Sequence, residues 1–144
     1  MEALRRLPKT AFYRIIIVCG LLIILASIEI LAKAKDLDYF NYVNQSLQAQ
    51  GTPVLTYGDF IVSMLAVYVG RILLPVGLGL NTYFAFIKIG YNKIFIWSWG
   101  IFTIAALAFH LLSLELNSVF YYLFIVIYLL LAIFLFGLNE SDKP

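Results

Sequence analysis

Cysteine and histidine each occur only once in the sequence, and this scarcity excludes several kinds of site. A single cysteine, Cys19, cannot form a disulfide within the chain, a CxxC redox pair or a thiolate metal cluster. A single histidine, His110, cannot build a haem or zinc site that needs several imidazoles. We therefore expect a chain with no cofactor and no metal site of its own.

Charge is scarce as well, because 12% of the residues are charged, against about 25% in an average soluble domain. Hydrophobic residues make up 63% of the chain, so it has too little polar surface for a water-exposed domain or a disordered tail. The net charge of +2 is too small to predict binding to nucleic acid. The class that remains is an integral membrane protein, which has the lipid bilayer as its first partner.

Recognisable catalytic motifs are also lacking. The sequence has no P-loop, no HExxH zinc motif and no serine nucleophile elbow. Gly77 and Gly79 lack the third glycine of a dinucleotide-binding loop and lie inside a long apolar run. We therefore expect no catalytic residues and no enzymatic activity.

Four apolar runs dominate what is present. A helix needs about 20 apolar residues to cross the roughly 30 Å hydrocarbon core, and its backbone groups must pair within the helix. The runs that meet this length are 12–32, 60–87, 94–113 and 119–138. We predict an all-α protein, a single domain over 1–144 that forms a four-helix transmembrane bundle. The last two connections are short, so we expect consecutive helices to pack as antiparallel neighbours.

Lysine and arginine are unevenly distributed between the two sides of this bundle. One side has two, Lys33 and Lys35. The other side has seven: Arg5, Arg6, Lys9, Arg14, Lys88, Lys93 and Lys143. Positive residues near helix ends favour the cytoplasmic side. We therefore predict a multi-pass protein of the inner or plasma membrane with both termini in the cytoplasm.

The first run also has features of a secretory signal peptide, namely a basic start and a step at 32–34 that resembles a cleavage site. Its apolar stretch is longer than that of a usual signal peptide, and Glu29 interrupts its end. We expect the run to be retained as a membrane helix.

The outer loop, 33–58, has a helical pattern of its own. Leu37, Phe40, Val43 and Leu47 recur at spacings of three and four residues, which predicts a short amphipathic helix on the membrane surface or on the bundle. Asp36 precedes this stripe and is a suitable N-cap. Gly51 and Pro53 follow it and are expected to end the helix, whereas the alternative is an ordinary structured loop.

Arg71 is the most informative residue, because it lies within the second apolar run, where an arginine is costly in lipid. We expect it to face the bundle or a wet cavity and to have a partner. Pro75 follows it by four residues and leaves the carbonyl of Arg71 without its helical donor. Steps of three and four predict one helix face that carries Met64, Tyr68, Arg71, Pro75, Leu78 and Thr82.

Glu29 is the expected partner, since a long arginine side chain that reaches outward meets a glutamate that reaches inward. His110 lies at a similar depth in the third run, and Asp59 marks the outer end of the second. We predict that Glu29, Arg71 and His110, with Tyr68 and Asp59, surround a polar pocket in the outer half. The competing interpretation is a buried ion pair that only fixes the register of the helices.

Two further patterns concern packing. Ala66 and Gly70 form a small-xxx-small step that predicts the close approach of a neighbouring helix. The stretch 124–136 has no polar side chain except that of Tyr128, so we expect it to face lipid or an apolar partner.

In its layout the chain resembles the DoxX-type four-helix membrane proteins. The likeness lies between Tyr13 and Lys93, in the early basic start and the loop of about 25 residues after the first helix, and the total length is also similar. The chain lacks the cysteines of the redox-associated relatives. The resemblance implies a four-helix membrane protein.

The sequence favours an accessory or structural subunit of a membrane assembly, because four helices bury a thin core and leave much apolar surface. The partners would be copies of the chain or other membrane subunits. The alternative is a small oligomeric transporter or ligand-binding membrane protein that uses the predicted pocket. A DoxX-like protein is the further alternative.

Overall fold

A computed structural model describes residues 5–140, and within this range the chain is helical and contains no strand. Four helices of the described range are long and apolar enough to cross a membrane, as the sequence predicts. Their bounds differ from the predicted ones by a few residues. The elements are α1 (Lys9–Lys35), α2 (Leu37–Ala49), α3 (Tyr57–Phe84), the π-helical η1 (Ala85–Ile89), α4 (Lys93–Leu112) and α5 (Val119–Glu140).

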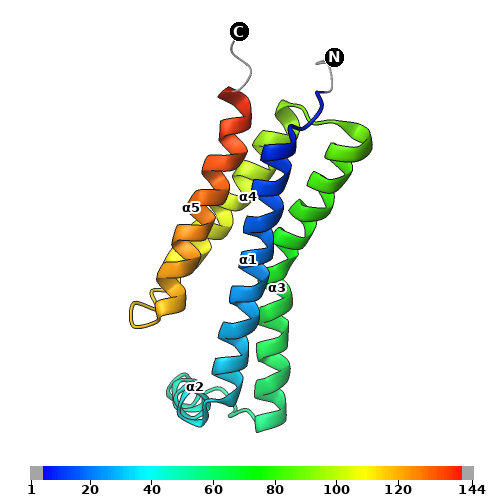
Figure 1. Cartoon of the computed structure of the whole chain (residues 1–144). Helices are drawn as coiled ribbons and strands as arrows, with labels where there is room; N and C mark the ends of the chain where they lie inside the picture. Colours follow the sequence, from blue (N-terminus) through cyan, green and yellow to red (C-terminus); the bar gives the residue numbers. More distant parts are fainter. Residues whose placement is uncertain (1–4, 141–144) are drawn as a thin grey trace.

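The helices are arranged as two pairs, in which α3 packs mainly against α1 and α4 packs mainly against α5. Contacts between α1 and α5 join the two pairs (Figure 1). The start of α1 and the end of α5 lie at the same end of the bundle, which we call the terminal end. The opposite end holds α2 and is called the α2 end. Lys143 lies outside the described residues.

Consecutive helices are not always packed neighbours, because α3 and α4 make few contacts despite the short connection between them. The sequence-based expectation is therefore wrong for this pair. The reason is that each helix uses its best packing face elsewhere. Pro75, Leu78 and Thr82 of α3 are buried on the side of the stripe predicted to face the bundle. On α4 the missing side chain of Gly100 makes room for the Phe136 ring of α5.

The stretch 124–136 does not face only lipid, because α5 contributes much of the core. Phe124, Tyr128, Leu131 and Leu135 are all buried, at spacings of three and four residues. This stripe belongs to the same hydrophobic core as Ile15, Val18, Cys19, Leu22 and Ala26 of α1. An all-apolar helix hides which of its faces is buried, and here one face is internal while the other remains exposed.

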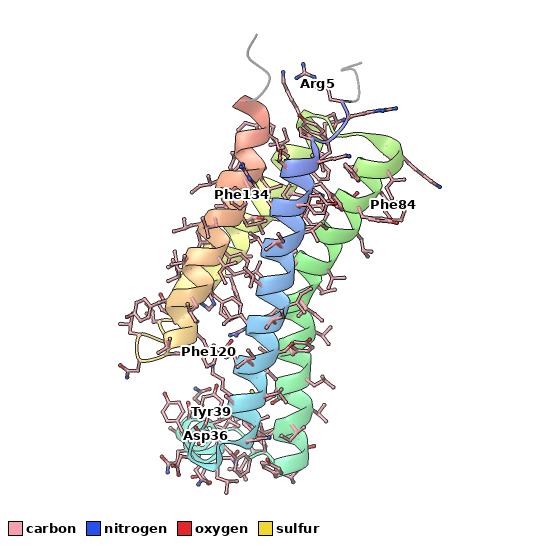
Figure 2. The ribbon with its side chains drawn as sticks, in the orientation of Figure 1. Arg5, Asp36, Tyr39, Phe84, Phe120 and Phe134 are labelled. Atoms are coloured by element: carbon pink, nitrogen blue, oxygen red, sulfur yellow. The ribbon has the colours of Figure 1, made fainter. Side chains whose placement is uncertain are left out.

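The terminal end is held together by short contacts that align the helix ends. Arg5 and Tyr91 exchange two backbone hydrogen bonds, of 3.0 and 2.7 Å. The Phe12 ring of α1 stacks on the Phe86 ring of η1 with 4.4 Å between the centroids. Gly90 has φ +74°, and a Cβ there would lie 2.6 Å from the Arg5 carbonyl oxygen, so only glycine fits this crossing. Figure 2 shows Arg5 at this end.

The predicted amphipathic helix is present as α2, which runs across the α2 end and is seen nearly end-on in Figure 1. Asp36 caps it, since its carboxylate accepts from the backbone N–H of Asp38 and Tyr39. The Phe40 ring contacts the Phe60 ring of α3 at 5.2 Å between centroids. Leu37 does not join this stripe, because it is 62% exposed.

Candidate functional site

A chain of four alternating charges crosses the bundle toward the α2 end. Arg71 of α3 donates through Nη1 to Oε2 of Glu29 in α1. Glu29 Oε1 lies 2.9 Å from Lys33 Nζ, one turn further along α1. Lys33 Nζ in turn donates to Oε2 of Glu115 at 2.6 Å, in the turn between α4 and α5. The expected pairing of Arg71 with Glu29 is therefore confirmed and extends by two more residues.

The directions of the helices explain why these side chains meet. The Cα–Cβ bonds of a helix tilt toward its N-terminus. Because α1 and α3 run in opposite directions, Glu29 leans toward the terminal end and Arg71 leans toward the α2 end. Glu29 and Lys33 are separated by four residues and therefore share a face of α1.

The burial of Glu29 makes its two cations necessary. Its side chain is 1% exposed, and an ionised carboxylate in such surroundings is unstable without partners. Arg71 and Lys33 bind one carboxylate oxygen each. With Glu115 the four charges sum to zero, so the chain of charges adds no net charge to the interior.

A cavity of about 470 Å³ lies between α3, α4 and α5, beside this chain of charges. Most of its wall is apolar, and the polar groups on it are few. From α3 it is lined by Val67, Gly70, Arg71 and Leu74, from α4 and the following residue by Ala106, Phe109, His110 and Ser113, and from α5 by Phe124 and Tyr128.

Arg71 is the charged residue on the cavity wall. Its side chain is 22% exposed although it binds Glu29, and its guanidinium carbon lies 5.4 Å from the centroid of the Phe124 ring. A guanidinium has five N–H donors in a planar fork. One donor binds Glu29, so others remain to bind an acceptor in the cavity. Arg71 thus joins a buried carboxylate on one side to an apolar cavity on the other.

His110 also lines the cavity, and its ring is held in place by neighbouring residues. Its Nε2 lies 3.2 Å from the carbonyl oxygen of Tyr121, so this nitrogen is the donor. The imidazole is stacked on the Tyr121 ring with centroids 5.1 Å apart, and Phe124 lies at the same distance on another side. These contacts fix the ring, and His110 is brought close to Arg71 without joining the chain of charges.

Tyr68 and Asp59 are the predicted site residues that the fold keeps apart from this cavity. The Tyr68 hydroxyl lies 3.1 Å from Ser27 Oγ and thus links α3 to α1. The Asp59 carboxylate accepts from Thr56 Oγ1 at 2.6 Å in the first turn of α3, and Thr56 caps the helix by accepting from the Asp59 backbone N–H. Neither residue lines the cavity.

Gly70 has a different role from the one predicted for it. No atom lies within 4 Å of the position that a Cβ would occupy, so no helix of the chain packs on the Ala66–Gly70 step. The missing side chain instead leaves open space at the cavity wall. The sequence also did not identify Lys33 as a site residue, although the spacing of Glu29 and Lys33 is that of a helical ion pair.

Comparisons with known proteins give no relative from which a role could be transferred, because no family model, curated protein or solved structure matches the chain. Among residues 5–140, no three His, Cys, Asp or Glu side chains are placed so that they could hold a metal ion. The chemistry available at this site is ion pairing, hydrogen bonding and apolar contact.

Proposed function

We propose that the chain crosses the membrane four times and that the terminal end faces the cytoplasm. The charge distribution supports this orientation. Lys33 and Lys35 are the described lysines at the α2 end, whereas the terminal end carries Arg5, Arg6, Lys9, Arg14, Lys88 and Lys93. Positive residues near helix ends favour the cytoplasmic side.

The lengths of the helices indicate the depth at which the chain of charges would lie in this membrane. At about 1.5 Å per residue, Glu29 lies about 30 Å from the start of α1 at Lys9, and Arg71 about 27 Å from Ile89. The apolar part of α5, Val119–Leu138, is also about 30 Å long. These lengths match the roughly 30 Å hydrocarbon core. The charges therefore belong at the boundary on the α2 side, where the cost of an arginine is lower than at the bilayer centre.

The function that this geometry favours is the binding of a small apolar molecule with an anionic or acceptor group in the cavity. The partly exposed Arg71 side chain, on a wall that is otherwise mainly apolar, is the observation that carries the proposal. Ligand sites commonly combine an apolar lining with a few placed polar groups, in volumes of roughly 300–1,000 Å³. A ligand of this kind would be held or passed across the membrane boundary.

A water-soluble probe tests this proposal without assuming the natural ligand. Thermal unfolding of the purified protein in neutral detergent is followed by circular dichroism, with para-butylbenzoate or the neutral para-butylbenzamide. A ligand that binds the folded state raises the unfolding temperature, and we expect a rise of about 5 °C at saturation for the anion. The amide should give a much smaller rise.

Arg14→Leu is a matched control for Arg71→Leu in this experiment. Arg14 also lies over a phenylalanine ring of α5, with 5.8 Å from its guanidinium carbon to the Phe134 centroid, but near the terminal end. The benzoate effect should disappear in Arg71→Leu and persist in Arg14→Leu. A rise that Arg71→Leu retains, or one that is lost only in Arg14→Leu, would contradict the proposal.

A structural or accessory role is the second candidate, and a different observation favours it. The first turns of α3 extend past the α4–α5 turn toward the α2 end (Figure 1) and expose Ile61, Val62 and Leu65. Such a patch at the membrane boundary fits another membrane subunit or a second copy of this chain. Replacing Val62 and Leu65 by serine should then reduce the assembly size seen on gel filtration, whereas an unchanged size would count against this role.

A further inference from the structure

The seam between α3 and α4 reaches the cavity from the side of the bundle. The two helices make few contacts with each other, and the cavity lies where they separate. Gly70 on α3 has open space in place of a side chain. Across the seam, Phe109 on α4 is 79% exposed although it lines the cavity. Both residues lie along the lengths of helices that we propose to cross the membrane, so this opening would face lipid.

The residues that line the cavity lie at different levels along α3 and α4. Ser113, His110 and Arg71 line the part toward the α2 end, since Ser113 directly follows α4 and His110 lies in its last turn. Leu74 and Ala106 lie further from that end, along α3 and α4 respectively. On α3 and α4, Arg71 and His110 thus lie nearer the proposed membrane boundary than the apolar Leu74 and Ala106 do. Lipids in the adjacent leaflet have the same order of head and tail.

We propose that the cavity binds a single-chain anionic lipid, which enters sideways between α3 and α4 from the leaflet at the α2 end. This inference rests on the proposed function and names the class of its ligand. The anionic head, a carboxylate or a phosphate monoester, accepts hydrogen bonds from the free N–H groups of Arg71. The acyl chain lies from Arg71 toward Leu74 and Ala106.

The volume of the cavity bears on the number of acyl chains that the ligand has, and the donors of Arg71 bear on its head group. A cavity of about 470 Å³ between three helices has room for the head and one tail, and a second tail would remain outside it. The charges of Glu29, Lys33 and Glu115 are already matched among themselves and with Arg71. The remaining N–H donors of Arg71 need acceptors, and a carboxylate or a phosphate monoester accepts charge-assisted hydrogen bonds that are stronger than those of a neutral acceptor.

Spin-labelled lipids test the lipid class directly. The protein is placed in phosphatidylcholine nanodiscs with doxyl-labelled stearate or with its uncharged methyl ester, and the motionally restricted fraction is measured by electron paramagnetic resonance. We expect the wild type to select the carboxylate over the ester by about fivefold, because a charge-assisted hydrogen bond forms only with the former. Arg71→Leu should lower this selectivity to about one.

Gly70→Leu tests the cavity without changing any charge. The new side chain would extend into the open space at the cavity wall, so the selectivity for the carboxylate should fall as in Arg71→Leu. Gly20→Leu is the matched control, since Gly20 also lies within a helix, also has no atom within 4 Å of an added Cβ, and does not line the cavity. It should keep the wild-type selectivity.

The outcomes separate this inference from the function on which it rests. If para-butylbenzoate stabilises the protein but stearate is not selected, the cavity binds anions and the lipid assignment is wrong. If neither probe acts through Arg71, both proposals are wrong. Labelled lysophosphatidic acid distinguishes a phosphate head from a carboxylate. Labelled phosphatidylglycerol that is selected as strongly as stearate would overturn the single-chain assignment.

Discussion

At the residue scale, Glu29 holds the chain of charges together, because it is the buried carboxylate that binds both cations, Arg71 and Lys33. Its loss would leave Arg71 and Lys33 as neighbouring cations with no carboxylate between them. The loss of Arg71, by contrast, leaves Glu29 bound to Lys33 at 2.9 Å and places an apolar side chain beside an apolar cavity. The two partners of one ion pair therefore differ in their importance for stability.

We predict that Glu29→Ala lowers the free energy of unfolding by about 3–5 kcal/mol, because it leaves the Arg71 guanidinium without its carboxylate partner inside the bundle. Arg71→Leu should change it by less than about 1 kcal/mol, since an ion-pair partner replaced by an apolar group is often tolerated. Unfolding by sodium dodecyl sulfate in mixed micelles, followed by circular dichroism, measures both. Equal losses for the two variants would show that Lys33 does not support Glu29.

The sequence predicts only part of this site. A charge inside an apolar run is costly, so the burial of Arg71 and its pairing with Glu29 follow from physical chemistry alone. The Lys33–Glu115 pair joins residues that are 82 positions apart, and this contact depends on where the α4–α5 turn ends. No periodicity in one helix contains that information. Asp59 is not part of the site for a similar reason, because its carboxylate binds the hydroxyl of Thr56, three residues away, in the first turn of α3.

At the element scale, the pairing of the helices is set by where small side chains lie. Gly100 is buried in α4, and a Cβ at this position would lie 2.5 Å from the nearest atom of the Phe136 ring. That ring is also in edge contact with Trp97 at 5.7 Å between centroids, which limits its movement. The length and polarity of the apolar runs predict four helices from the sequence. The packing of the Phe136 ring against Gly100 can be seen only in the folded structure.

Gly100→Val should therefore destabilise the protein by about 1–3 kcal/mol through overpacking between α4 and α5. The same detergent unfolding experiment measures the effect. Gly137→Val in α5 is the control, because an added Cβ there meets no atom within 4 Å. A loss of stability that is no larger for Gly100→Val than for Gly137→Val would contradict this packing.

The Asn44 side chain helps to fix the position of α2, because it both donates a hydrogen bond to the backbone and accepts one from it. Asn44 Nδ2 donates to the Leu55 carbonyl at 3.1 Å, and the Leu55 N–H donates to Asn44 Oδ1 at 2.8 Å. We predict that Asn44→Ala raises the hydrogen-exchange rate of the Leu55 amide by about fivefold, since one hydrogen bond contributes about 1 kcal/mol. Exchange within α1 should be unaffected. An unchanged rate at Leu55 would mean that other contacts position α2.

At the scale of the whole molecule, the chain consists of two helix pairs that are joined along α1 and α5, with few contacts between α3 and α4. The contacts of Arg5, Phe12 and their partners close the terminal end, whereas the charges and the cavity lie toward the α2 end. The number of helices that are long and apolar enough to span a membrane follows from the sequence, but the scarcity of contacts between α3 and α4 does not. Short connections favour packed neighbours, and here tertiary packing favours other pairs.

The proposed orientation predicts the behaviour of reporters fused to the chain. Alkaline phosphatase, which is active only outside the cytoplasm, should be inactive at the C-terminus and active when inserted in the connection between α2 and α3. Green fluorescent protein should show the opposite pattern. A C-terminal phosphatase fusion with high activity would reverse the orientation and place the cavity in the cytoplasmic leaflet.

Native mass spectrometry of the protein released from its own membrane in mild detergent tests the central claim most directly. The claim is that the cavity beside Arg71 holds a small anionic ligand. The wild type should carry one such molecule per chain, and Arg71→Leu should give the bare mass at a similar yield of folded protein. Identical spectra for the two proteins, with or without bound molecules, would contradict the account.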